Sequence, residues 1–253
     1  VLKLQSPWIL VVETVLPLDA MLKSICILVQ LLSLVLAWNL PNTGNRCTIR
    51  LNQMTIDQSE VSARVANTDR GRIVEPEKRQ ELDNYFQELE KRCTDPSPAR
   101  NPFVQGRWLV EYTDASAPSN GQLGPFAGIA MQEVDLETNR YTNILKVPPN
   151  DWLTATLEAN WKEWDGILLS EQDDEGKTNL DSWDPNHDYG ATSWVVTFES
   201  LTIRLFGISL VRKKFENTKR IWRTTYIDEN TRIVRAGRTG EEKDEMFFYM
   251  TRV

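Results

Sequence analysis

From residue 104 to residue 252, apolar and polar side chains alternate in eight short segments that are separated by turn-forming residues. A period of two residues is the pattern of a β-strand with one buried face. Eight strands with short connections fit a closed antiparallel barrel better than a sandwich. We therefore predict a mainly β fold with strands at 104–113, 128–136, 141–147, 153–161, 193–206, 220–227, 232–236 and 245–252. The segment 193–206 is long for one strand, so it either bends or merges with 208–211.

The last predicted strand is apolar on both faces. Met246, Phe248 and Met250 alternate along it with Phe247 and Tyr249. A strand with two apolar faces needs two partners, so we expect the barrel interior to cover one face and a helix to cover the other.

The segment 75–93 predicts the helix. Pro76 suits a first helical position, and acidic residues on both sides of it favour the positive end of the helix dipole. Four apolar side chains recur at helical spacing and form one face, which we expect to pack on the barrel: Leu82, Tyr85, Phe86 and Leu89. This places an N-terminal helical region and linker at 57–100 and the barrel at 101–253.

The first 56 residues have the composition of targeting sequence. From Met21, a short basic start leads into an apolar run and small residues, which predicts a signal peptide at 21–37. The run is shorter than the roughly 20 residues that span a bilayer. Residues 38–56 are basic and lack acids, as in a transit peptide. We interpret 1–20 as an upstream, non-native extension; the alternative is an apolar hairpin formed by 1–37.

Charge and cysteine content narrow the classes of function. The net charge of −7 argues against a nucleic-acid partner, because phosphate binding needs a basic surface. Cys26 and Cys47 fall in the predicted leader, which leaves Cys93 as a single thiol without an intrachain disulfide. Without the leader, we expect a mature protein with no transmembrane span.

Catalytic and metal-binding motifs are not evident. His187 is the only histidine, which argues against a serine–histidine–acid triad and a multi-histidine metal site. The acidic stretch from Asp173 to Gly176 does not have the ligand spacing of a calcium-binding loop. Asp228 and Glu229 lie where a turn is expected, so we interpret them as turn residues. We predict no cofactor, no metal and no enzymatic activity.

Two C-terminal motifs and one near the start of the barrel carry a resemblance. Residues 106–113 read GRWLVEYT, residues 225–228 read TYID, and Arg232 and Arg235 follow in the next strand. In this order they resemble the signature of the plastid lipid-associated proteins, or fibrillins. The resemblance covers roughly residues 64–253, and it departs from the family pattern at 148–191.

The resemblance implies a lipocalin-like barrel that binds a carotenoid, a quinone or a lipid at thylakoids or lipid globules. In such barrels the Gly-x-Trp tryptophan packs under an arginine from a late strand. The implied structural residues are Gly106 and Trp108, with Arg252 or Arg235 as the arginine and Asp228 in the signature turn.

The candidate ligand-binding residues follow from strand alternation. Trp108, Val110 and Tyr112 share one face of the first strand. We expect Val110 and Tyr112 to line the barrel together with Ile129 and Met131 of the second strand, if that register is right; a slip of one residue would reverse the face.

The predicted location depends on the resemblance. A signal peptide followed by an aromatic-led transit peptide is similar to the bipartite leader of algae with secondary plastids, so we expect a plastid protein. Two alternatives stay open: a carotenoid- or lipid-modifying enzyme on the same barrel, and a secreted lipocalin-type carrier.

Overall fold

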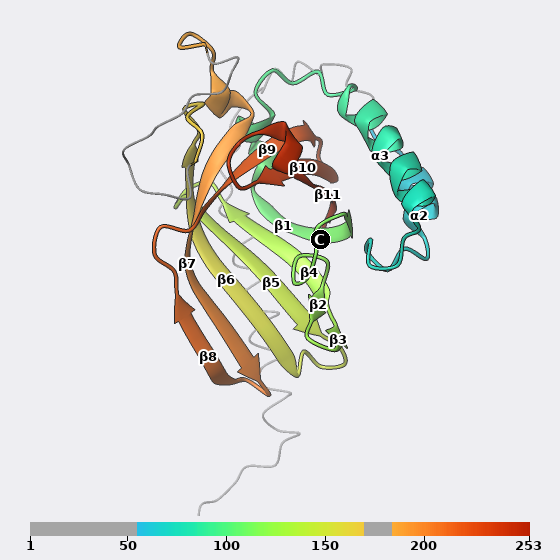
Figure 1. The fold of residues 1–253 in the computed structure, drawn as a ribbon, viewed down its shortest axis with the longest axis vertical. Coiled ribbons are helices and arrows are strands. Elements are labelled where there is room, and N and C mark those ends of the chain that lie inside the picture. Colours follow the sequence, from blue (N-terminus) through green and yellow to red (C-terminus); the bar gives the residue numbers. More distant parts are fainter. Residues whose placement is uncertain (1–54, 170–183) are drawn as a thin grey trace, which may run out of the picture. The chain divides into compact units, whose positions relative to one another are not determined.

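The computed structural model of the protein describes residues 55–169 and 184–253. Eight antiparallel strands close into a barrel, which confirms the predicted fold class (Figure 1). Around the barrel the order is β6-β5-β4-β1-β11-β10-β9-β7, and β7 pairs again with β6. The strands are β1 (Gly106–Thr113), β4 (Ile129–Asp135), β5 (Arg140–Val147), β6 (Leu153–Glu163), β7 (Ser193–Leu205), β9 (Lys219–Ile227), β10 (Thr231–Gly237) and β11 (Met246–Arg252).

The long strand β7 has two different partners on one side. Its first residues, from Ser193 to Thr197, pair with β9 and close the barrel, whereas residues 200–205 pair with a separate strand, β8 (Ile208–Lys214). The segment that follows residue 206 therefore does not merge with β7. Phe206 and Gly207 both have positive φ angles of 48° and 81°, which is the geometry of a two-residue turn whose twist matches its strands.

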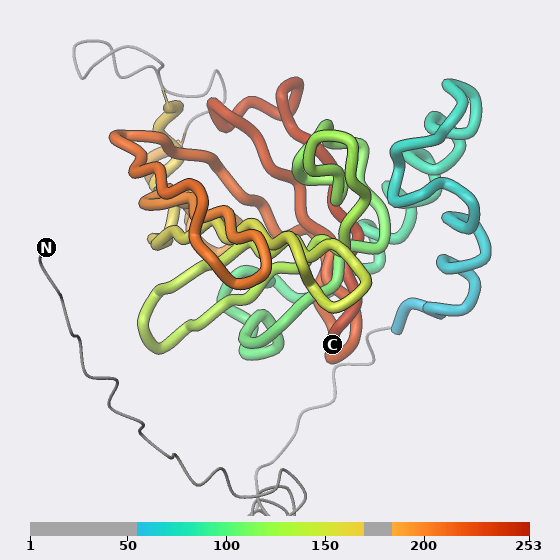
Figure 2. Tube along the Cα trace, turned by 90° about the horizontal axis from the view of Figure 1, so that it is seen from below, coloured from blue at the N-terminus to red at the C-terminus, as the bar shows by residue number. Residues whose placement is uncertain are grey.

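Two helices cover one outer side of the barrel (Figure 2). The helix α3 (Pro76–Glu90) corresponds to the predicted one, and α2 (Gln58–Val65) precedes it. Phe86 of α3 is fully buried, and its ring centroid lies 4.4 Å from that of Phe247 and 5.4 Å from that of Tyr249. The expectation of a helix on the outer face of the last strand is confirmed.

The strand β11 accordingly separates two apolar cores. Phe248 and Met250 belong to the barrel interior, and Phe247 and Tyr249 belong to the cluster under the helices. Burial of all four residues explains why this strand is apolar on both faces.

Short elements complete the described part of the chain. The hairpin of β2 (Gln122–Leu123) and β3 (Phe126–Ala127) lies between β1 and β4, and it was not predicted. Four 3-10 turns connect the larger elements: Pro98–Arg100, Pro102–Val104, Tyr189–Ala191 and Glu242–Asp244. Within residues 55–169 and 184–253, the helices fall short of the length and apolar character that crossing a bilayer requires.

Candidate ligand-binding site

The barrel interior contains a cavity of about 220 Å³. An apolar cavity of roughly 150 Å³ holds a benzene ring, so this one has room for a ring or part of an acyl chain. The side chains around it are uncharged, and most are apolar. They are Val110, Pro118, Ser119, Ala130, Met131, Gln132, Asn143, Ile144, Leu145, Ala155, Leu157, Leu201, Phe215, Trp222 and Phe248.

The pairing of the strands defines which positions of β4 face inward. Gln132 pairs with Trp108 of β1 and with Asn143 of β5, and all three belong to the interior side. Ala130 and Gln132 are buried, whereas Ile129 and Met131 alternate with them and are half-buried. Of the four predicted ligand-binding residues, Val110 and Met131 border the cavity, and Ile129 does not.

Tyr112 lies on the other face of β1 from Val110. The pairing with β11 shifts register between Val110 and Tyr112, as in a β-bulge. An extra residue in one strand reverses the alternation beyond it. Tyr112 therefore packs under the helices, 5.5 Å from Phe86 between ring centroids. The expectation that it shares an inward face with Val110 was wrong for this reason.

A chain of polar side chains forms one wall of the cavity. The Gln132 amide nitrogen donates to the Tyr141 hydroxyl at 2.8 Å, and this hydroxyl donates to Asn143 Oδ1 at 2.9 Å. Arg232 Nη1 of β10 donates to Gln132 Oε1 at 2.5 Å. Arg232 is fully buried, and burial lowers its pKa to about 10, so it still carries its charge at neutral pH. Arg232 belongs to the signature that resembles the family, but its position in the interior was not predicted.

The closed end of the barrel is built around Trp108. Its indole is fully buried and donates to the Val104 carbonyl at 3.0 Å. The Arg252 guanidinium lies 4.3 Å from the Trp108 ring centroid, within the range of a cation–π contact. Arg252 is thus the arginine that covers the tryptophan. Gly106 has a φ of 115°, a backbone conformation that favours glycine, and a Cβ there would displace the end of the Arg252 side chain, 2.9 Å away.

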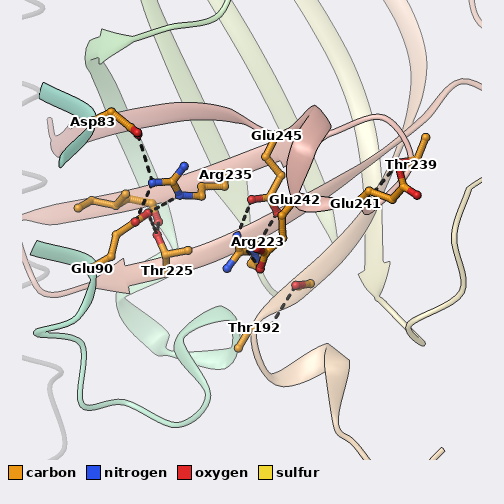
Figure 3. Close-up of polar contacts among 12 residues, drawn as sticks. Asp83, Glu90, Thr192, Arg223, Thr225, Arg235, Thr239, Glu241, Glu242 and Glu245 are labelled. Carbon is orange, nitrogen blue, oxygen red and sulfur yellow. Dashed lines mark hydrogen bonds and ion pairs between the residues drawn. The ribbon is translucent and has the colours of Figure 1, made fainter. Parts of the chain in front are cut away.

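Arg235 and Asp228 have other structural positions. The Arg235 guanidinium faces α3 and forms two hydrogen bonds of 2.8 Å with the Glu90 carboxylate (Figure 3). Asp228 accepts hydrogen bonds from the backbone nitrogens of Asn230 and Thr231 at 2.8 and 2.7 Å, so it stabilises the turn between β9 and β10.

Exposed apolar side chains gather near the turn between β5 and β6, the turn between β7 and β8, and strand β3. The Trp152 ring lies 4.9 Å from Phe126 and 6.1 Å from Phe206 between centroids. Phe206 is 75% exposed and Ile208 is 70% exposed. Strand β8 then ends in three consecutive cations, from Arg212 to Lys214. We refer to Phe126, Trp152, Phe206 and Ile208 as the apolar rim.

Residues 55–169 and 184–253 hold no group of three histidine, cysteine or acidic side chains that could bind a metal ion. His187 packs edge-on against Tyr189, with ring centroids 4.5 Å apart. Cys93 is a half-buried free thiol beside the helices, and burial raises its pKa. The acidic stretch from Asp173 to Gly176 and the predicted leader lie outside the described residues, as do Cys26 and Cys47.

No protein-family model matches the chain, and a search of curated proteins finds no match. The resemblance to the plastid lipid-associated proteins stays a prediction from sequence.

Proposed function

We propose that this protein is a carrier that binds one small apolar ligand inside its barrel without converting it. The cavity is the observation that carries the proposal, because an apolar space with a few uncharged polar groups is the usual form of a small-molecule site. Following the family resemblance, we propose a lipid, a quinone or a carotenoid as the ligand, at thylakoids or lipid globules of a plastid.

Tryptophan fluorescence provides the test, because Trp222 borders the cavity. The full chain is titrated with a galactolipid, plastoquinone and a carotenoid, and the ligand is then extracted and analysed. A carrier gives saturable quenching, and the ligand is recovered unchanged. Conversion of the ligand would instead indicate an enzyme, and no quenching with any of the three would contradict a ligand-binding barrel.

A matched pair of variants assigns the binding to the cavity. Ala155 borders the cavity, so Ala155→Phe places a ring in the space that the ligand needs. Ala127 lies on the exposed strand β3, so Ala127→Phe adds the same ring outside. We expect only Ala155→Phe to abolish quenching. Equal affinity of the two variants would show that the ligand binds elsewhere.

We further propose that the apolar rim contacts an anionic lipid surface. The chain carries a net charge of −7, yet β8 begins in the rim with Ile208, continues with the exposed Leu210 and Val211, and ends in three cations. Apolar side chains beside cations bind anionic membranes through both contributions. Phe206 also has a left-handed backbone at the turn, a conformation that a bulky side chain rarely adopts.

Vesicle flotation tests the surface contact. We expect the full chain to float with vesicles that contain anionic lipid, and the double variant Phe206→Ser with Ile208→Ser to stay in solution. The control is Ile73→Ser, which removes an equally exposed apolar side chain between α2 and α3. Flotation of the double variant, or loss of flotation in Ile73→Ser alone, would contradict a role of the rim.

The plastid location has its own test. A fluorescent fusion of residues 21–60 in an alga with a secondary plastid should enter the plastid, and Trp38→Ala should hold it in the endoplasmic reticulum. Export of the fusion into the medium would favour a secreted carrier instead.

A further inference from the structure

Arg232 is fully buried, and it differs in its partners from the half-buried arginines of the barrel wall. Arg223 and Arg235 each face a carboxylate, Glu245 at 2.5 Å and Glu90 at 2.8 Å. The hydrogen bonds of Arg232 go to the Gln132 amide and, at 3.5 Å, to the Thr224 hydroxyl. No carboxylate among the described residues pairs with it. A buried charge without a counter-charge is costly, so the interior favours an anion at this place.

Other donors in the same interior also lack an acceptor. The Nε of Arg232 and the indole nitrogens of Trp161, Trp194 and Trp222 are buried without a hydrogen-bond partner in the described protein. All four are donors. The Arg232 guanidinium lies 5.5 Å from the Trp194 ring centroid, and Trp194 stacks on Trp161 at 4.0 Å. The interior around Arg232 and the tryptophans thus holds one positive charge and several donors without a partner. A group that forms hydrogen bonds with these donors must be an acceptor.

The cavity borders one of these donor residues and the hydrogen-bond partner of another. Trp222 and Gln132 both border it, and Gln132 Oε1 is the acceptor that Arg232 Nη1 uses. A ligand oxygen that takes the place of this amide oxygen therefore accepts hydrogen bonds from the Arg232 guanidinium. The released Gln132 still has the Tyr141 hydroxyl as a neighbour.

We propose that the barrel binds a single-chain carboxylate amphiphile of the fatty-acid type, with its carboxylate at Arg232 and part of its hydrocarbon chain in the apolar cavity. This inference rests on the proposed carrier function and names its ligand class. A carboxylate accepts the two parallel hydrogen bonds that a guanidinium offers, and it neutralises the charge. A hydrocarbon, an alcohol or a quinone supplies no such charge.

The test compares two ligands that differ only in the head group. The full chain is titrated with palmitate and with hexadecanol, and tryptophan quenching is followed. We expect palmitate to bind at least about tenfold more tightly, because a hydrogen bond between two charged groups is worth about this factor or more. Arg232→Met should lose this preference and still bind hexadecanol, whereas Arg232→Lys should retain part of it.

The outcomes separate the two proposals. If neither palmitate nor hexadecanol binds, this inference fails, and the carrier function fails with it only if the galactolipid, plastoquinone and the carotenoid do not bind either. If both bind equally to the unaltered protein, or if Arg232→Met keeps the preference, the carrier stands and the carboxylate site is wrong.

A second measurement needs no variant, so it holds even if Arg232→Met does not fold. In the unaltered protein, the nuclear magnetic resonance signal of the Arg232 Nε–H should shift when palmitate is added. Hexadecanol should leave that signal in place. A signal that moves equally with both ligands, or with neither, would overturn the site.

Discussion

Arg232 and Arg235 lie three residues apart on β10 and face opposite sides of the barrel wall. Outside, Arg235 is 16% exposed, and the Glu90 carboxylate of α3 accepts both of its short hydrogen bonds. Inside, Arg232 is fully buried, and an uncharged amide is its closest partner. Within residues 55–169 and 184–253, Arg235 has a counter-charge on the helix side and Arg232 has none in the interior. The outer arginine therefore stabilises the fold, and the inner one is left for a ligand.

The two sides of the wall also differ in the apolar contacts that surround each arginine. Under the helices, Arg235 lies 5.5 Å from the Phe247 ring, next to a packed cluster around Phe86. In the interior, Arg232 lies beside stacked tryptophans and a cavity. A close-packed region with paired charges is typical of a structural core, whereas unpaired donors beside a cavity are typical of a site.

The largest expected effect concerns the packed end of the interior. Trp108→Ala removes a fully buried indole, its hydrogen bond to Val104 and the contact with Arg252. We expect a loss of about 3–5 kcal/mol in the free energy of unfolding, as for other buried aromatic side chains replaced by alanine. Denaturant unfolding measures it. Phe206→Ala is the control, because a 75% exposed ring should change stability by less than about 0.5 kcal/mol. Equal stability of the two variants would contradict the closed end.

The next largest effect is expected when the ion pair between Arg235 and Glu90 is removed. Glu90→Gln keeps the shape of the side chain and removes the charge that faces Arg235. We expect a loss of about 2–3 kcal/mol, since a largely buried guanidinium then lacks its main partner. Asp83, at 3.7 Å from Arg235, limits the loss. Glu88→Gln on the same helix is the control, because Glu88 is 65% exposed and pairs with exposed Lys91. If both variants unfold alike, the Arg235 pair is not structural.

Replacement of Arg232, which has no counter-charge among the described residues, should not destabilise the ligand-free protein. Arg232→Met replaces a buried charge that has no counter-charge by an apolar side chain of similar length. We expect the ligand-free protein to be equally stable or more stable by up to about 2 kcal/mol. Arg235→Met should instead lower stability, because it leaves Glu90 without its partner. Thermal unfolding of both variants measures the contrast, and a loss of the same size in both would show that the two arginines have the same role.

The sequence predicted the wall of the barrel well, because alternation depends on local residue order. All eight predicted strands are present, since each has one face in the interior. The helix was predicted from the spacing of its own apolar residues, and its position on β11 from the two apolar faces of that strand. A β-bulge cannot be predicted from the alternation of residues along one strand. The bulge between Val110 and Tyr112 therefore went unpredicted, and it places Tyr112 on the outer face.

The site was harder to predict for a related reason. Alternation places Arg232 and Arg235 on opposite faces of β10. Each face therefore carries an arginine, and the local sequence does not show which arginine lies inside. The same ambiguity affected β4, where Ala130 and Gln132 are the buried residues and, of the predicted Ile129 and Met131, only Met131 borders the cavity. The acceptor of Arg232 comes from Gln132, one hundred residues earlier in the chain. Contacts of this range depend on how the barrel closes.

The smallest expected effect concerns an arginine–carboxylate pair in solvent, Arg140 with Glu199. The Glu199 carboxylate accepts hydrogen bonds from Asn160 Nδ2 at 2.8 Å and Arg140 Nη1 at 2.6 Å, and these lower its pKa. The ionised form is thus favoured by folding. Its contribution is present above the unfolded pKa of about 4.3 and is lost as the pH falls below it. Glu199→Gln should therefore cost less than about 1 kcal/mol at pH 7, because both side chains are about 40% exposed, and less still at pH 3. Denaturant unfolding at both pH values measures this difference. A loss at pH 7 as large as that of Glu90→Gln would show that burial does not set the difference between paired arginines, and a loss that stays constant down to pH 3 would contradict the lowered pKa.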